Sequence, residues 1–314
     1  MRMCLMVEGQ EDITWDEWRA LASACEEAGL EALFRSDHYL SVMGRVGRGS
    51  LDAWATLAAL AAVTERIRLG TMVSPATFRH PSVIAKSVVT VDHVSGGRAE
   101  LGLGAGWHED EHRAYGFPFP PTGTRMEILA EQLEIVARSW DDGSFDFDGT
   151  HYRVEDLDAL PKPVRRPRPN LIVGGAGNRR SAELAARWAD EYNTVHCGPQ
   201  ECARRKGTVD DACERAGRGP LTFSLMTGAI VGVDERDVRR RAENVMTVMG
   251  DSGSTDDFLD NVRDDWVVGT VEQAAERLAE LADAGVQRVM LQHIAHRDVD
   301  MVHLLGEEVA AALR

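Results

Sequence analysis

Residues 15–38, WDEWRALASACEEAGLEALFRSDH, contain one complete unit of the pattern that decides the fold. Apolar residues recur at helical spacing in its first half, and Gly29 then stands where a helix commonly ends in a left-handed residue. The short apolar run 32–35 predicts a buried strand, and the polar residues Asp37 and His38 follow its end. A helix, a glycine and a buried strand in this order are typical of α/β proteins with a parallel sheet.

The same alternation continues along the chain. Further helices are expected at 54–64, 82–94, 125–140, 180–188 and 271–284. The expected strands, eight in total, lie at 3–7, 32–35, 67–73, 99–104, 170–173, 191–195, 222–231 and 288–291. Eight strands with intervening helices predict a single (β/α)8 TIM barrel that spans 1–314, rather than an open doubly wound sheet.

Two segments interrupt this alternation. Residues 141–169 are rich in Asp, Gly and Pro and predict a hairpin followed by an extended link, and residues 249–266 form an irregular acidic insertion. Long loops that follow strands lie at the C-terminal mouth of a barrel, where active sites are found. We therefore expect both insertions to form walls or lids of the mouth.

The charge balance limits the classes of partner. The chain has 35 Lys and Arg against 51 Asp and Glu, a formal net charge of −16. This charge disfavours nucleic acid and anionic membranes, which attract clustered basic residues. We expect no membrane span and no signal peptide, because no apolar run is long enough. Five cysteines without a C-x-x-C pair predict reduced thiols, no metal site and a cytoplasmic location; they are Cys4, Cys25, Cys197, Cys202 and Cys213.

Three strand ends carry candidate chemistry. Asp37 and His38 place a carboxylate and an imidazole at the end of the second strand, and an imidazole is suited to proton transfer near neutral pH. The run 101–107, LGLGAGW, lets backbone N–H groups approach a ring or an anion. The run 173–180, VGGAGNRR, opens a helix and predicts a phosphate cradle. The alternatives are a loop-capping pair without chemistry for the first, and ordinary tight turns for the other two.

One motif points to a different class of enzyme. Residues 108–112, HEDEH, match the H-E-x-x-H pattern of zinc proteases. In those enzymes the second face of the helix packs into an apolar core, whereas residues 108–113 here are all charged or titratable. We interpret the match as accidental.

Together these motifs resemble the bacterial-luciferase-like flavin monooxygenase superfamily, and most of all its F420-dependent oxidoreductase branch. The resemblance covers nearly the whole chain in the right order, which makes it far more specific than any single motif. It implies a (β/α)8 barrel, commonly a homodimer, with a flavin or deazaflavin at the C-terminal mouth. The segments that carry it are 36–39 (SDHY), 69–81, 92–98 (DHVSGGR), 102–111, 116–118 (GFP), 147–152 (FDGTHY), 169–178, 189–193 (ADEYN) and 269–273 (GTVEQ).

The resemblance also implies roles for individual residues. His38 is implied as the proton-transfer residue, with Asp37 beside it near the reactive ring, and Tyr39 and Trp107 are implied in the substrate pocket. A cis peptide bond is implied between Met72 and Val73, where it would support the ring from behind. The implied cofactor-binding residues are Asp37, Met72, Val73, Ser74, Gly104, Ala105, Gly106, Ala176, Gly177 and Asn178.

The implied reaction is the transfer of a hydride between coenzyme F420 and a small organic substrate. The alternative is an FMN-dependent two-component monooxygenase, which uses O2 and reduced flavin from a separate cofactor reductase. A degenerate barrel that only binds an anion is a third hypothesis. Relatives that oxidise glucose 6-phosphate carry a Trp and an acid where this chain has Val42 and Trp107. We therefore do not expect a sugar phosphate, and Trp107 indicates a flatter, more apolar substrate.

Overall fold

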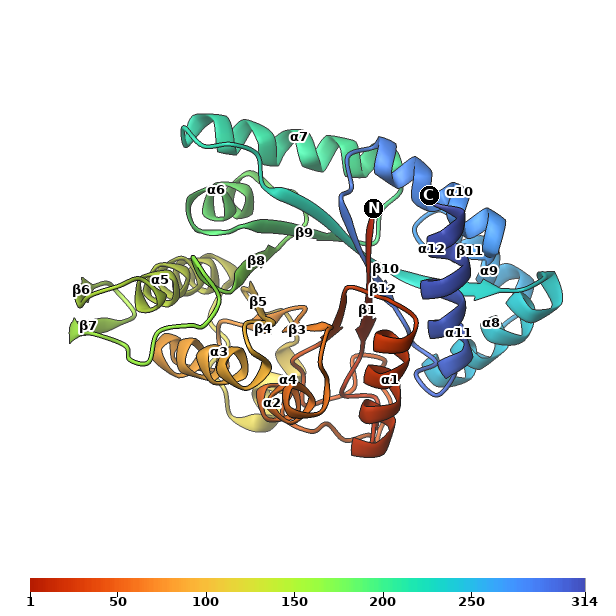
Figure 1. Cartoon of the computed structure of the whole chain (residues 1–314), viewed down its shortest axis with the longest axis horizontal. Helices are drawn as coiled ribbons and strands as arrows, with labels where there is room; N and C mark the ends of the chain where they lie inside the picture. Colours follow the sequence, from red (N-terminus) through yellow and green to blue (C-terminus); the bar gives the residue numbers. More distant parts are fainter. Residues whose placement is uncertain (314) are drawn as a thin grey trace.

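Eight parallel strands close into a barrel in the computed structural model, which describes residues 1–313. Each strand pairs with the next, and the last pairs back with the first. The strands surround a central axis and the helices lie outside them (Figure 1). The predicted (β/α)8 barrel is therefore confirmed. Its strands are β1 (Arg2–Val7), β2 (Ala32–Arg35), β3 (Arg68–Thr71), β5 (Ala99–Gly104), β8 (Asn170–Gly174), β9 (Glu191–Val195), β10 (Thr222–Gly232) and β12 (Arg288–Gln292).

The helical elements form the outer layer. They are α1 (Trp15–Glu27), α2 (Ala53–Val63), α3 (Pro81–Ser95), α4 (Glu109–Tyr115), α5 (Thr122–Trp140), α6 (Arg179–Trp188), α7 (Pro199–Arg215), α8 (Glu235–Met249), α9 (Thr255–Val262), α10 (Val271–Asp283), α11 (Val299–His303), the π-helical turn η1 (Leu304–Val309) and α12 (Ala310–Ala312). Local sequence explains several of their ends. Thr14 and Glu17 form a capping box at the start of α1, and Gly29, just beyond its end, has φ of 77°.

Side chains of the barrel strands alternate between the barrel interior and the helix layer. On β1, Cys4 and Met6 belong to the small apolar cluster inside the barrel, whereas Leu5 and Val7 belong to the large cluster between strands and helices. This alternation is the geometric rule for closed sheets. The residue that follows Val7 therefore points inward, at the level where the barrel opens to solvent.

The base of the barrel, at the N-terminal ends of the strands, is filled by charged side chains. Arg288 is fully buried and donates hydrogen bonds to Glu100 (2.7 Å) and Glu191 (3.0 Å), and also to Glu31 (2.9 Å). Arg68 forms a second ion pair with Glu100. Burial raises the pKa of Glu100, but the two arginines outweigh it and lower this pKa to about 2. The base is thus closed by an internal ion-pair network.

The first predicted insertion, 141–169, starts at the base of the barrel and runs outside the helix layer (Figure 1). Its hairpin, β6 (Phe145–Asp148) and β7 (Arg153–Leu157), extends along the outer side of α5, where the Glu131 carboxylate accepts hydrogen bonds from the N–H groups of residues 150–152 (Figure 1). The link that follows passes the end of α3, where Asp92 accepts two backbone hydrogen bonds. The prediction of a wall at the mouth is wrong for most of this segment, because it joins a helix to the next strand and so starts at the opposite end of the barrel. Only its turn reaches the start of α3, where the rings of Tyr152 and His80 lie 5.1 Å apart and Gln132 donates a hydrogen bond to the Tyr152 hydroxyl.

The second insertion, 249–266, lies beside the mouth. It contains α9 and leads into β11 (Val267–Thr270), a strand that the sequence did not predict and that pairs with the outer half of β10. The Thr227 hydroxyl donates to the backbone carbonyl of Asp265. The Trp266 ring lies so close to Gly228 that a Cβ at that glycine would come within 2.1 Å of it. This segment therefore packs against the mouth end of β10.

Candidate active site

His38 and Glu111 form a hydrogen-bonded pair at the mouth. His38 follows β2, and Glu111 lies on α4, the short helix after β5. Nδ1 of His38 lies 2.8 Å from Oε2 of Glu111, whose other oxygen accepts the N–H groups of Tyr39 and Leu40. The Glu111 side chain is completely buried, while that of His38 remains 11% exposed. The pair fixes the imidazole ring and leaves its Nε2 edge on the side away from Glu111.

The pair also changes the ionisation of both groups. Burial alone would lower the pKa of His38, but the hydrogen bond and negative charge of Glu111 outweigh burial and raise it. Burial alone would raise the pKa of Glu111, and the bonds from His38 and two backbone N–H groups lower it instead. The structure therefore favours an imidazolium beside a carboxylate over a wide pH range. This state is suited to giving a proton to, or taking one back from, a reacting oxygen.

Asp37 points away from the open mouth. Its carboxylate accepts hydrogen bonds from the Ser74 hydroxyl (2.6 Å) and from Arg79 (2.5 and 3.2 Å), and only 1% of Asp37 is exposed. Arg79 also pairs with Asp52 at 2.8 Å. Asp37 thus links the ends of β2 and of the short strand β4 (Ser74–Pro75). The sequence brought Asp37 and His38 together as one pair, whereas their side chains belong to two different networks.

The two histidines of the zinc-protease motif do not converge. His112 is buried and uses both ring nitrogens, one at 2.6 Å from the Thr77 hydroxyl and the other at 2.7 Å from the His108 carbonyl oxygen. Within residues 1–313, no group of three His, Cys, Asp or Glu side chains is arranged to hold a metal ion. The residue of this motif that contacts His38 is Glu111, a partner that the sequence did not predict. The only sequence feature that pointed to a role for this segment was the run of charged or titratable residues 108–113, which has no apolar face.

The Val73 side chain, which follows β3, lies against the ends of β5 and β8. The peptide bond between Met72 and Val73 is cis, as predicted. A Cβ at Gly104 would come within 2.7 Å of the Val73 side chain, and one at Gly174 within 3.1 Å, so glycines at the ends of β5 and β8 make room for it. Gly106, with φ of 79°, lies against Thr77 and Pro75, where a Cβ would come within 3.0 and 3.3 Å of them. A surface of backbone and one valine, beside a fixed imidazole, fits the flat ring of a flavin or deazaflavin.

The predicted phosphate loop follows β8 and opens α6. Asn178 caps this helix by accepting the Ser181 N–H, and the Gly177 N–H donates to the Tyr192 hydroxyl at 2.8 Å. Arg205 packs over Gly177, where a Cβ would come within 2.4 Å of it. Ala176 and Asn178 are exposed. The loop is thus held from below while its outer surface, at a helix N-terminus, faces solvent.

Aromatic rings form one wall of the mouth. Trp107 is 62% exposed, stacks on His108 with ring centroids 5.0 Å apart, and meets the His38 ring edge-on at 5.6 Å. Tyr39 stacks on Phe78 at 5.4 Å. The structure therefore places Trp107 next to His38, whereas the Tyr39 hydroxyl is directed to Asp52 at 2.9 Å.

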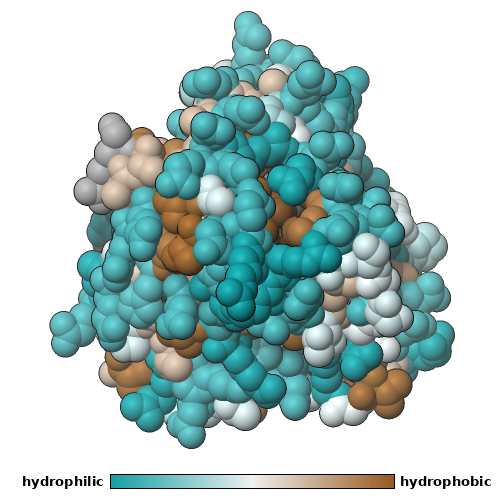
Figure 2. Space-filling model, turned by 90° about the vertical axis from the view of Figure 1, so that its right-hand side faces the viewer, coloured by the Kyte–Doolittle hydropathy of each residue, from teal (hydrophilic) through white to brown (hydrophobic). Residues whose placement is uncertain are grey.

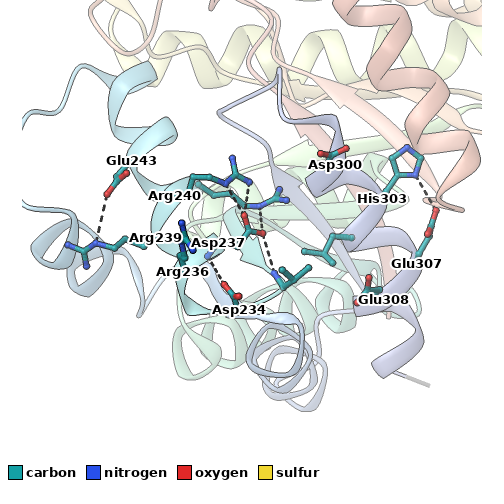
Figure 3. A pocket seen from close by; sticks show the side chains of 13 residues that line it. Asp234, Arg236, Asp237, Arg239, Arg240, Glu243, Asp300, His303, Glu307 and Glu308 are labelled. Carbon is teal, nitrogen blue, oxygen red and sulfur yellow. Dashed lines mark hydrogen bonds and ion pairs between the residues drawn. The ribbon is translucent and has the colours of Figure 1, made fainter.

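A separate open groove of about 900 Å³ lies in the helix layer, between α8 and the α11–η1 segment. Figure 3 shows that several charged side chains along it pair with one another, such as Arg240 with Asp237 and His303 with Glu307. Figure 2 shows this side of the molecule, which is hydrophilic over most of its surface. Because these side chains pair with one another across the surface, we place the candidate site at His38 and not in this groove.

Among residues 1–313, no helix is long and apolar enough to cross a membrane.

Comparisons with known proteins agree with this geometry. The model of the luciferase-like monooxygenase family matches residues 3–288. An uncharacterized protein of Mycobacterium tuberculosis, Rv0953c, is 39% identical over 146 residues, which are 46% of this chain and 50% of that protein. The match to such curated relatives thus spans about half of their length.

Solved structures resemble the whole barrel. The monooxygenase RslO1 from Streptomyces bottropensis has a TM-score of 0.84 at 22% identity, with 99% of each chain covered. An F420-dependent secondary alcohol dehydrogenase, solved with an F420-acetone adduct, has a TM-score of 0.83 at 18% identity, covering 100% of this chain and 99% of that one. The oxygenating constituent of 3,6-diketocamphane monooxygenase from Pseudomonas putida, in complex with FMN, has a TM-score of 0.77 at 18% identity, covering 99% and 98%. At these identities the likeness establishes the fold.

Proposed function

Because this chain belongs to the luciferase-like monooxygenase family, whose members are oxidoreductases or monooxygenases, we propose that it transfers a hydride between coenzyme F420 and a small organic substrate. The observation that carries this proposal is the pair His38–Glu111, which holds an imidazole at the mouth with one ring nitrogen away from its partner. When bound, a deazaflavin supplies the hydride. The protein must then provide orientation and a proton at the oxygen of the substrate.

His38 performs the proton transfer in this proposal. In the direction of carbonyl reduction, the Nε2–H of His38 gives its proton to the developing alkoxide, and in the reverse direction Nε2 removes the hydroxyl proton. Glu111 keeps the ring oriented and stabilises its protonated form. Asp37 is a positioning residue, because its carboxylate is occupied by Ser74 and Arg79.

The Val73 surface would support the ring of the cofactor. The residues that would hold the cofactor are Met72, Val73 and Ser74 behind the ring, Gly104, Ala105 and Gly106 along it, and Ala176, Gly177 and Asn178 at its phosphate. Trp107 packs against the substrate on the side of His38, and Tyr39 supports that wall through Phe78. Two further parts of the proposal are a homodimer of single-domain chains and a cytoplasmic location, in keeping with five buried free cysteines.

Binding of F420, FMN and FAD, measured side by side by fluorescence titration, tests the cofactor. Tight binding of F420 with weak binding of FMN supports hydride transfer. Tight binding of reduced FMN without binding of F420 overturns it in favour of the two-component monooxygenase with a separate reductase. Loss of turnover in His38→Ala with cofactor binding retained distinguishes an enzyme from a barrel that only binds an anion.

A further inference from the structure

Glu8 is an acidic side chain on the floor of the mouth. It directly follows β1, where the alternation of Cys4 and Met6 inward with Leu5 and Val7 outward directs the next side chain inward. The side chain therefore lies one layer above Met6, at the opening of the barrel. Only 7% of Glu8 is exposed. Nothing in the proposed chemistry of His38 and Glu111 requires an acid at this position.

Neutral amides hold this carboxylate. One oxygen of Glu8 accepts a hydrogen bond from Gln10 Nε2 at 2.7 Å, and the other accepts one from Gln292 Nε2 at the end of β12. Gln10 is itself fixed by the Ser36 hydroxyl, which donates to its Oε1 at 2.5 Å. Each carboxylate oxygen can accept two hydrogen bonds, so this set fixes the orientation of Glu8 and leaves acceptor capacity.

The other buried acids at this end of the barrel have cationic partners. Glu11 pairs with Arg48, Asp37 with Arg79, and Glu111 with His38. Within residues 1–313, Glu8 has no Lys, Arg or His nitrogen within 4.0 Å. A buried carboxylate without a counter-ion is costly, so such a group is more often found where a ligand completes its environment.

The charge of Glu8 also reaches the proton-transfer residue. Burial acts to lower the pKa of His38, and the charges of Glu111 and Glu8 are among those that raise it. Glu8 and His38 follow the adjacent strands β1 and β2. The ends of these strands are joined by the hydrogen bond from the Gly9 N–H to the Ser36 hydroxyl at 3.0 Å. This adjacency places Glu8 and His38 beside the same opening.

We propose that Glu8 selects the substrate: its carboxylate accepts a hydrogen bond from a hydroxyl or amino group and disfavours anionic molecules. The inference rests on the proposed function only in taking the mouth as the substrate site. It narrows the substrate to neutral or cationic molecules that carry a hydrogen-bond donor near the reacting carbon.

Three probes with the same ring test this selection: cyclohexylammonium, cyclohexanol and cyclohexanecarboxylate. Their dissociation constants are measured by NMR on the cofactor-loaded enzyme, with the ring signals of His38 reporting that each probe occupies the mouth. We expect the ammonium probe to bind at least about tenfold more tightly than the carboxylate, because the two differ mainly in their charge beside Glu8.

Two variants remove the charge in different ways. Glu8→Gln keeps the shape of the side chain, and Gln292→Lys places a cation against Glu8. Either variant is expected to reduce the ratio of the two dissociation constants, carboxylate probe over ammonium probe, to about threefold or less. Glu8→Asp retains the charge and should retain most of the preference. Glu109→Gln, at an exposed acid on the rim, is the matched control and should leave the ratio unchanged.

The inference is overturned if no probe binds, if the wild type shows no preference against the carboxylate, or if both charge-removing variants keep the wild-type ratio. The measurement needs no turnover and is repeated without cofactor. A failure of F420 binding would therefore refute the proposed function and leave the test of Glu8 intact.

Discussion

The two ends of the barrel use the same kinds of side chain in opposite ways. At the base, Arg288 contacts Glu100 and Glu191, and all three side chains are at most 2% exposed. At the mouth, Glu111 is equally buried, but its partner His38 keeps one edge of the ring toward the opening. Glu8 accepts hydrogen bonds from neutral amides, and within residues 1–313 it forms no ion pair.

The difference teaches where charge stabilises the fold and where it serves chemistry. In the base, Arg288 and Arg68 offset the charge of the carboxylates inside a region closed to solvent, although Glu191 Oε1 and Arg68 Nη2 have no hydrogen-bond partner within residues 1–313. At the mouth, the His38 ring keeps one edge toward the opening, and Glu8 is held by neutral amides. Variants at the base should therefore lower stability, and variants at the mouth should lower activity. A variant that lowers stability and activity equally would contradict this comparison.

Arg288→Met is expected to have the largest effect. It removes the cation while Glu100 and Glu191 stay buried, and breaking such a buried pair typically costs about 3–5 kcal/mol of stability. Urea denaturation followed by circular dichroism measures this loss. The fraction that remains folded should bind the cofactor as the wild type does; a loss of less than about 1 kcal/mol would mean that the base network does not stabilise the barrel.

His38→Gln is expected to lower turnover by about 100-fold or more, the usual contribution of a positioned acid or base. At about 1.36 kcal/mol per factor of ten, this loss is at least about 2.7 kcal/mol in the transition state. Steady-state kinetics and denaturation on the same preparation give both quantities. Turnover within about threefold of the wild type would remove His38 from the chemistry.

Glu111→Gln is expected to shift the pH dependence by a smaller amount. Glu111 is the main group that raises the pKa of His38 against the effect of burial, so the variant should lower that pKa and move the associated limb of the pH–rate profile to lower pH. NMR titration of the His38 ring provides an independent measurement. An unchanged His38 pKa would show that the pair does not control protonation.

The His38–Glu111 pair also determines how the stability of the fold changes with pH. The raised pKa of His38 gives stability that is complete below the ordinary histidine pKa and is lost as pH rises through the raised value. The lowered pKa of Glu111 gives stability that is complete above the ordinary glutamate pKa and is lost as pH falls through the lowered value. The stability difference between wild type and Glu111→Gln should therefore be largest between the ordinary pKa of glutamate and the ordinary pKa of histidine. It should become smaller at lower and at higher pH.

Trp107→Ala is expected to have the smallest effect on the fold. The side chain is 62% exposed, so stability should change by no more than about 0.5 kcal/mol. Because Trp107 lies against His38, KM for the substrate should rise by about threefold to tenfold with less change in kcat. A large loss of stability would mean that the aromatic wall belongs to the core.

The sequence predicted the barrel well because its signals are local. Each strand is a short apolar run followed by polar residues, and Gly29 marks the end of a helix. These features, and the position of His38 after the second strand, depend on residues within a few positions of one another. The cis bond at Met72–Val73 is different, because it was implied by the family resemblance and not by any local pattern.

The missed features depend on distant residues. Glu111 is 73 positions from His38, and its role appears only when β2 and α4 meet at the mouth. Glu8 and Gln292 are 284 positions apart and meet because β1 pairs with β12. The hairpin at 145–157 was misplaced because composition reveals a turn but not the end of the barrel from which it starts.

Val73 lies between two kinds of surroundings. One side of its isopropyl group occupies the space left by the missing side chains of Gly104 and Gly174, and the residue also packs against the apolar cluster that contains Met72. The position of this side chain is therefore set by glycines on two other strands, with no ionisable group involved. A side chain at either glycine would displace Val73, so the shape of this surface can be altered separately from the charge of His38 and Glu8.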